Sequence, residues 1–313
     1  MLSSLEILQG HLLVKRFVET NRGVAYMLLA SFLFSLMGGF AKELSHHMSS
    51  LEVVFFRNIF GVLLLGATLF GRPMNHKGGK PFLLLFRGLI GFIAVLAFFY
   101  NIANIALADA ITFSKTSPIF TAFFAWLFLK EKISPFGWLA LFIGFIGIVL
   151  ITQPSGLTLT KTDLLGIFSG VGAALAYTSV KELKKYYDTR AIVLSFTGVG
   201  TIGPIILMFI APYIETSEFD FLFAEFVMPS GQQWFSVVAM GTLATLAQVF
   251  MTKAYGMSKA GLVATISYST IAFSIILGIF LGDEFPTFVT ILGILLITVA
   301  GILVAKKPKK VKE

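Results

Sequence analysis

The 313-residue sequence contains no cysteine and little charge. Without thiolates it can form neither a disulfide nor a thiolate-ligated zinc or iron–sulfur site. Charged residues make up 13% of the chain, whereas a soluble domain carries about 25%. At the same time, 57% apolar residues exclude a disordered chain. The composition therefore excludes an ordinary soluble domain, because too few charges remain to cover its surface.

Histidine is also scarce, and all four histidines lie outside the apolar runs of the sequence. With no inward-facing histidine and no cysteine, we expect no metal cluster and no nucleophile–base pair of an enzyme. No glycine-rich phosphate loop follows a strand-like segment, so ATP-driven chemistry is not expected either. The sequence predicts no cofactor.

Long apolar runs are abundant instead. A helix needs about 20 mainly apolar residues to cross a bilayer, and ten runs approach or reach this length. They are Gly23–Lys42, Leu51–Phe70, Phe82–Asn104, Ala108–Leu129, Pro135–Thr152, Leu164–Leu183, Ala191–Tyr213, Trp234–Tyr255, Gly261–Gly282 and Pro286–Ala305. Ten runs joined mostly by short connections cannot pack into one soluble core, so they predict an all-α membrane protein with ten transmembrane helices.

The basic residues indicate how these helices are oriented. If residues 1–22 are cytoplasmic, 20 of the 24 lysines and arginines fall on the cytoplasmic side, and only Lys42 and Lys161 fall in outer loops. Residues 1–22 have an amphipathic pattern, which predicts a helix on the membrane surface or a frayed tail. The net charge of +8 is then an orientation signal, not a nucleic-acid site, and the basic tail 306–313 is expected to face anionic membrane lipids. We predict a multi-pass protein of the bacterial inner membrane with both termini in the cytoplasm.

The chain also repeats itself. Ala41–Leu44 and Val180–Leu183 share the letters Lys-Glu-Leu at an offset of 139 residues, and later matches occur at offsets of 153 and 154. We predict two five-helix repeats, over residues 23–154 and 163–305. Because five is odd, the second repeat would enter the membrane from the opposite side, as in transporters that work by alternating access.

The residues of both repeats resemble a known family. The resemblance rests on the stretches Ser117–Phe120 with Leu129–Lys132, Ile271–Phe273 with Leu281–Glu284, Phe55–Arg57, Phe98–Tyr100, Ala108–Ala110 and Gln248–Tyr255. They resemble the EamA family of the drug/metabolite transporter superfamily, and most closely its branch of riboflavin and S-adenosylmethionine carriers. The resemblance implies ten helices, cytoplasmic termini and a central cavity lined mainly by the first, third, fourth, sixth, eighth and ninth helices.

Lys115 is the main candidate for substrate binding. A charge inside a membrane span is costly and is a functional candidate by default. The offset of 153 residues relates Lys115 to Tyr268, so we expect the two to face each other near the pseudo-twofold axis. Lys115 would then attract an anionic group, and Tyr268 would stack or donate a hydrogen bond. The alternative is that Lys115 extends to the membrane interface.

Further candidates are polar residues within the apolar runs. For substrate binding they are Gln248, Tyr100, Asn101, Thr112, Thr252 and Ser267, with helix packing as the alternative. Structural or gating roles are expected for Arg57, Asp109, Pro118 and Arg87. We expect Arg57 to form an ion pair with an acidic residue on its side of the membrane, such as Glu52, and Arg87 to reach lipid phosphates.

These patterns favour a secondary transporter that moves a small organic metabolite by alternating access. The cargo is expected to be amphipathic or aromatic with an anionic part, and riboflavin-like, adenosylmethionine-like, amino-acid-derived and carboxylate cargo all stay open. A lipid-carrier flippase is the alternative, and a membrane-embedded enzyme is less favoured. The fifth and tenth helices, which carry glycines, should brace the two halves or contact a second subunit, so a homodimer is one expectation.

Overall fold

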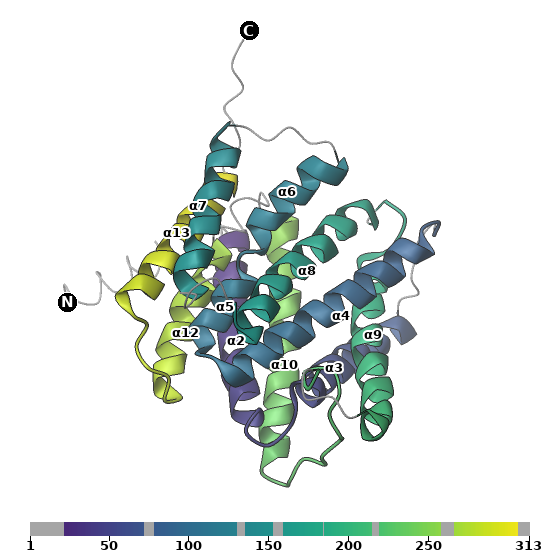
Figure 1. Ribbon diagram of the computed structural model, residues 1–313. Helices are drawn as coiled ribbons and strands as arrows, with labels where there is room; N and C mark the ends of the chain where they lie inside the picture. The colour runs from purple at the N-terminus through teal and green to yellow at the C-terminus, as the bar shows by residue number, and fades with distance from the viewer. Residues whose placement is uncertain are drawn as a thin grey trace, which may run out of the picture.

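The computed structural model describes residues 22–71, 78–129, 135–152, 159–183, 185–214, 219–257 and 266–305, and the segments predicted for residues 1–21 and 306–313 lie outside them. Within the described part every regular element is helical (Figure 1). The helices are α2 (Arg22–Leu44), α3 (Ser50–Gly71), α4 (Pro81–Asn104), α5 (Leu107–Ser114), α6 (Ser117–Leu129), α7 (Pro135–Thr152), α8 (Lys161–Leu183), α9 (Thr189–Ile210), the 3-10 turn η1 (Ala211–Tyr213), α10 (Gln233–Met257), α12 (Ser269–Phe280) and α13 (Phe288–Ala305).

Six of these helices are long and apolar enough to cross a membrane, and they coincide with predicted spans. They are Arg22–Leu44, Ser50–Leu69, Pro81–Asn104, Lys161–Val180, Arg190–Tyr213 and Gln233–Met251. Three shorter apolar helices lie within α7, α12 and α13. The all-helical membrane fold is confirmed, while the count of ten membrane-crossing helices stays a prediction.

The predicted fourth span is two helices rather than one, because α5 ends at Ser114 and α6 begins at Ser117. A proline at position 118 lacks an amide hydrogen, and its ring would clash with the carbonyl of residue 114 in a continuous helix. At the interruption, the Thr116 hydroxyl donates to the Phe113 carbonyl at 2.6 Å. A corresponding interruption occurs at Tyr268, immediately before α12. The two repeat-related positions Lys115 and Tyr268 therefore both lie at helix interruptions.

The helices pair across the two halves of the chain. α2 packs on α10, and α4 packs on α8. α3 packs on α9, and α7 packs on α13; Figure 1 shows α4 beside α8 and α7 beside α13. A Cβ atom on Gly147 would lie 2.9 Å from the Gly293 carbonyl oxygen, so glycine permits the close approach of α7 to α13. If each helix is replaced by its counterpart in the other half, the α3–α9 and α7–α13 pairs stay the same, and the α2–α10 pair becomes the α4–α8 pair. Two similar repeats require this symmetry.

Hydrogen bonds show which helix ends meet. Lys42, near the end of α2, forms an ion pair with Asp283, which follows α12. Asn101, near the end of α4, donates to the Thr162 carbonyl at the start of α8 at 2.9 Å. We call this end of the molecule the Asp220 face, after an aspartate that pairs with Lys161 there. The opposite end, where Lys80 pairs with Glu182 at 3.0 Å, is the Glu182 face.

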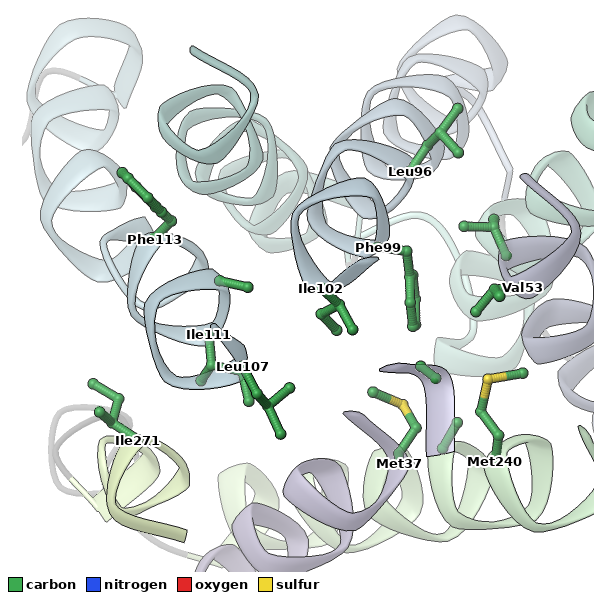
Figure 2. Close-up of a cluster of buried hydrophobic side chains, with 14 of the residues drawn as sticks. Met37, Val53, Leu96, Phe99, Ile102, Leu107, Ile111, Phe113, Met240 and Ile271 are labelled. Carbon is green, nitrogen blue, oxygen red and sulfur yellow. The ribbon is translucent and has the colours of Figure 1, made fainter. Parts of the chain in front are cut away.

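An apolar cluster fills the centre of the molecule near the Asp220 face. Figure 2 shows side chains of α2, α4, α5 and α10 pointing toward one another. Met37, Phe99, Leu107, Ile111 and Met240 are each no more than 3% exposed. The space between the halves is therefore closed by packed side chains at this end.

Candidate functional site

A cavity of about 240 Å³ lies between α3, α4, α9 and α10, so both halves of the chain contribute to its wall. Of the described lining residues, four are basic and none is acidic. Its wall includes the side chains of Arg57, Arg87, Arg190, Phe196, Gln248 and Lys253. We call this space the basic cavity. An environment of this kind attracts anions and repels cations.

Two glycines allow α9 to approach α4 and shape the basic cavity. A Cβ atom on Gly88 would lie 3.0 Å from the Ser195 carbonyl oxygen, and one on Gly91 would lie 2.5 Å from Nη1 of Arg87. The Ser195 hydroxyl also donates to the Leu84 carbonyl at 2.8 Å, which fixes α9 against α4. Gly91 therefore leaves the room that the Arg87 guanidinium occupies.

Arg57 and Arg87 both face the ring of Phe196. The Cζ atom of Arg57 lies 5.7 Å from the ring centre, and that of Arg87 lies 4.5 Å from it. Arg57 also donates to the Asn58 side-chain oxygen at 3.1 Å. Arg87 is only 9% exposed, and its Nε and Nη1 atoms have no hydrogen-bond partner in the described structure. Neither guanidinium forms an ion pair with a described residue, so the site holds buried positive charge that an anion would compensate.

These positions differ from the expectations for the two arginines. Glu52, the expected partner of Arg57, accepts hydrogen bonds from the amides of Ser49 (2.8 Å) and Val227 (2.7 Å) instead. Arg87 does not extend to the membrane surface, because its side chain is buried against Phe196. The sequence therefore did not predict that Arg57 and Arg87 both line this cavity.

The other two basic residues lie nearer the Glu182 face. Arg190 is in the first turn of α9, where its side chain contacts Asp188 at 3.2 Å and its amide donates to the same carboxylate at 2.9 Å. Lys253 is exposed, and its amine lies 5.8 Å from the ring centre of Tyr26. Because both residues are near helix ends at the Glu182 face, the basic cavity extends toward that face.

Of the predicted substrate-binding residues whose side chains the structure describes, Gln248 alone lines the basic cavity. Lys115 and Tyr268 lie at the two helix interruptions and are not part of its wall. Tyr268 is 5% exposed and belongs to the central apolar cluster, whereas Lys115 is partly exposed and its amine has no hydrogen bond or ion pair with the described residues. Their role in binding stays a prediction.

The remaining candidates make contacts elsewhere. The Tyr100 hydroxyl donates to Asp220 at 3.2 Å, Asn101 binds the start of α8, and Thr112 donates to the Ala108 carbonyl of its own helix at 2.7 Å. Ser267 is buried beside α12, where its carbonyl accepts a hydrogen bond from the Thr270 hydroxyl at 2.7 Å. The side chains of Thr252 and Pro118 lie outside the described residues.

A second cavity, of about 180 Å³, lies at the Asp220 face and is lined by Asp109, Asp283 and Glu284. We call it the acidic cavity. Beside it, Asp283 pairs with Lys42 and accepts a hydrogen bond from the Leu107 amide at 2.8 Å. The Lys42 amine also donates to the Ile105 carbonyl at 3.2 Å. These contacts join α2, the start of α5 and the end of α12, and so tie the two halves together at this face.

The internal sequence repeat contains a signal that could have identified part of the basic cavity. The offset of 139 residues that relates Lys42 to Lys181 also relates Arg57 to Phe196. α3 and α9 are the second helices of their halves and pack on each other, so equivalent residues on them can meet near the pseudo-twofold axis. Applying this offset to Arg57 would have placed it beside an aromatic ring.

The sequence profile of the EamA-like transporter family matches residues 21–153 and again residues 160–306. The chain belongs to the EamA-like transporter family. Two successive matches agree with the paired helices of the structure and confirm the two-repeat membrane fold. The resemblance found in the sequence is thus confirmed, and because the family and its named members are transporters, the protein is a multi-pass membrane transporter and not an enzyme.

Several relatives cover nearly the whole chain. An uncharacterised transporter of Helicobacter pylori is 36% identical over 93% of this chain and 96% of its own length. The pseudopaline exporter CntI of Pseudomonas aeruginosa is 33% identical over 92% and 97%. An S-adenosylmethionine uptake transporter of Rickettsia felis is 26% identical over 92% and 94%.

A crystal structure with 18% sequence identity superposes with a TM-score of 0.56, covering 90% of this chain and 96% of the other. This likeness concerns the fold alone.

Proposed function

We propose that the protein is a secondary transporter that moves a small organic anion across the cytoplasmic membrane by alternating access. The observation that carries the proposal is the basic cavity between α3, α4, α9 and α10, which has four basic residues and no acidic residue in its described wall. Buried, uncompensated guanidinium groups are costly unless they serve a ligand. The apolar part of the wall, including Phe196, suits an organic rather than an inorganic ion.

The orientation in the proposal places both termini and the Glu182 face in the cytoplasm, as the distribution of lysine and arginine favours. Two basic residues, Lys42 and Lys161, fall on the opposite side. Each forms an ion pair with an aspartate, Lys42 with Asp283 and Lys161 with Asp220. The exceptions are thus locally neutralised, and the basic cavity opens toward the cytoplasm.

Alternating access in this proposal exchanges the conformations of two inverted repeats. The helix interruptions at Lys115 and Tyr268 give each repeat a position where its fourth helix can bend, and discontinuous helices are common at transporter substrate sites. Opening the Asp220 face would require the Lys42–Asp283 ion pair to separate and the apolar cluster to part. Lys115 and Tyr268 are proposed to reach the substrate in that second state.

The relatives support a small metabolite as cargo, since one is named for the export of pseudopaline and another for the uptake of S-adenosylmethionine. Their names describe opposite directions of transport. The basic cavity itself favours an anion over a cation as cargo.

A thermal-shift screen of purified protein tests the proposal with anionic, neutral and cationic metabolites of similar size. Organic anions should raise the melting temperature of the wild type, and Arg57→Gln should abolish that shift. Lys115→Ala tests the second-state contact, because it should reduce transport in vesicles more than binding in detergent. Stabilisation by cationic metabolites only, or by lipids only, would overturn the proposal.

A further inference from the structure

The pair formed by Arg57 and Arg87 on Phe196 is an unusual arrangement of like charges. Both guanidinium carbons lie within cation–π distance of this ring: that of Arg57 is 5.7 Å from the ring centre, and that of Arg87 is 4.5 Å from it. The ring attracts each cation but cannot neutralise either of them. We call this group the arginine clamp.

The arginine clamp is built to receive an anion. Arg87 is 9% exposed and lines the basic cavity with its Nε and Nη1 atoms unpartnered in the described structure. A guanidinium offers its nitrogens in a planar fork that matches a carboxylate or a phosphate group. Gly91 leaves space for the Arg87 side chain, and Ser195 holds α9 and therefore Phe196 in register. The clamp is therefore fixed by its neighbours before any ligand arrives.

The same cavity contains a second basic group near its cytoplasmic mouth, formed by Arg190 and Lys253. Phe196 follows Arg190 by six residues on α9, which places the clamp about 9 Å deeper along the helix axis. Asp188 pairs with Arg190, whereas no described acidic residue pairs with Lys253 or with the arginine clamp. A single monovalent anion would leave most of this positive charge uncompensated.

We infer that the substrate is an elongated molecule with two acidic groups, and that the arginine clamp holds one while the Arg190–Lys253 group holds the other. This inference rests on the proposed function and specifies its substrate class as linear dicarboxylates and longer polycarboxylates. A compact dianion such as inorganic phosphate reaches only one of the two groups. Two tethered carboxylates gain affinity because binding of the first raises the effective concentration of the second.

Calorimetric titration of purified protein with α,ω-dicarboxylates of four to ten carbons tests the inference. Monocarboxylates of the same length and inorganic phosphate serve as separate probes. We expect affinity to rise with chain length to an optimum, where the dicarboxylate binds at least about tenfold more tightly than its matched monocarboxylate. The Arg87→Gln and Lys253→Gln variants should each remove this advantage, while Arg22→Gln, an exposed residue at the start of α2, should keep it.

The outcomes separate the two proposals. If no anion of any kind binds, the proposed function fails. If monocarboxylates bind as tightly as dicarboxylates, the function survives and the inference of an elongated diacid is wrong. If phosphate binds more tightly than both, the inference and the organic-anion part of the proposed function both fail. Arg87→Lys distinguishes misfolding from lost recognition: it keeps the charge but not the fork, so a folded variant should show weaker binding with the length optimum retained.

Discussion

The two cavities of this transporter differ in charge and in how they are closed. The acidic cavity at the Asp220 face lies beside an ion pair that joins the halves, and packed apolar side chains close the centre nearby. The basic cavity near the Glu182 face keeps two guanidinium groups without described acidic partners. At the Asp220 face Asp283 is paired with Lys42, although Oδ1 of Asp109 is buried without a hydrogen-bond partner in the described structure; near the Glu182 face neither Arg57 nor Arg87 has a described acidic partner. The difference between the cavities is therefore that a described counterion neutralises Asp283 in the acidic cavity, whereas none neutralises the two arginines of the basic cavity.

The largest effect is expected when a charge is removed from the basic cavity. Arg57→Gln should weaken anion binding by roughly 100-fold, or about 3 kcal/mol, because it deletes a partly buried charged contact to the ligand. Its melting temperature without ligand should stay unchanged or rise, because the substitution removes a partly buried charge that has no described counterion. Calorimetry and thermal unfolding check the two parts, with Arg22→Gln as the control. Loss of stability together with binding would show that Arg57 is structural.

The opposite result is expected at the Asp220 face. Asp283→Asn should destabilise the protein by about 2 kcal/mol, because it leaves Lys42 without its partner in a site where both side chains are 13% exposed. Asp220→Asn is the matched control: the Lys161–Asp220 pair is 36% and 52% exposed, so its loss should cost less than about 1 kcal/mol. Thermal unfolding of both variants measures the difference. Equal effects would mean that the Lys42 ion pair does not hold this face closed.

The sequence predicted the membrane fold, the repeat and the family, because apolar length and repeated motifs are local properties. The apolar run Ala108–Leu129 was predicted as one helix. Hydrophobicity alone does not reveal the interruption that accompanies the proline at position 118. The sequence also could not show that Glu52, the expected partner of Arg57, makes a different contact. Glu52 is engaged by the Val227 amide, 175 residues away in the chain, and no local pattern reports such a contact.

Arg87 shows the same limit in the binding site. Its burial depends on Phe196 in the other half of the chain and on the missing side chain of Gly91. From the sequence alone, an arginine in the second turn of a membrane helix is expected to reach lipid phosphates. Gln248 does lie in the wall of the basic cavity, and its polarity within an apolar helix is visible locally; its role in binding stays a prediction.

A smaller effect is expected when a methyl group is added beside Arg87 in the basic cavity. Gly91→Ala places a methyl group where the Arg87 guanidinium lies, since the added Cβ would be 2.5 Å from Nη1. We expect anion binding to weaken about 5- to 10-fold, or about 1 kcal/mol, because a displaced side chain must find a new position. Gly66→Ala is the control, because a Cβ there meets nothing within 4 Å. Unchanged binding in Gly91→Ala would show that the position of Arg87 does not matter.

The smallest expected effect concerns the partly exposed ion pair of Lys80 and Glu182 at the Glu182 face. Hydrogen bonds from Lys185 and from Lys80 lower the pKa of Glu182 below its usual value of 4.5, so its contribution to stability is present above that value and is lost as the pH falls through the lowered pKa. The pKa of Lys80 is raised, chiefly by its hydrogen bond to Glu182, so its contribution disappears only as the pH rises through the raised value. Thermal unfolding of wild type and Glu182→Gln should differ slightly at neutral pH and converge in acid. A difference that grows as the pH falls below 4.5 contradicts this interpretation.

The most direct measurement uses the absence of cysteine in the natural chain. Thr245 lines the basic cavity, so Thr245→Cys introduces a single reactive thiol there. In inside-out vesicles a membrane-impermeant maleimide should modify this thiol, and a dicarboxylate of optimal length should slow the reaction. Modification from the outer side only, or at the same rate with and without the dicarboxylate, would contradict a cytoplasm-facing cavity that binds the transported anion.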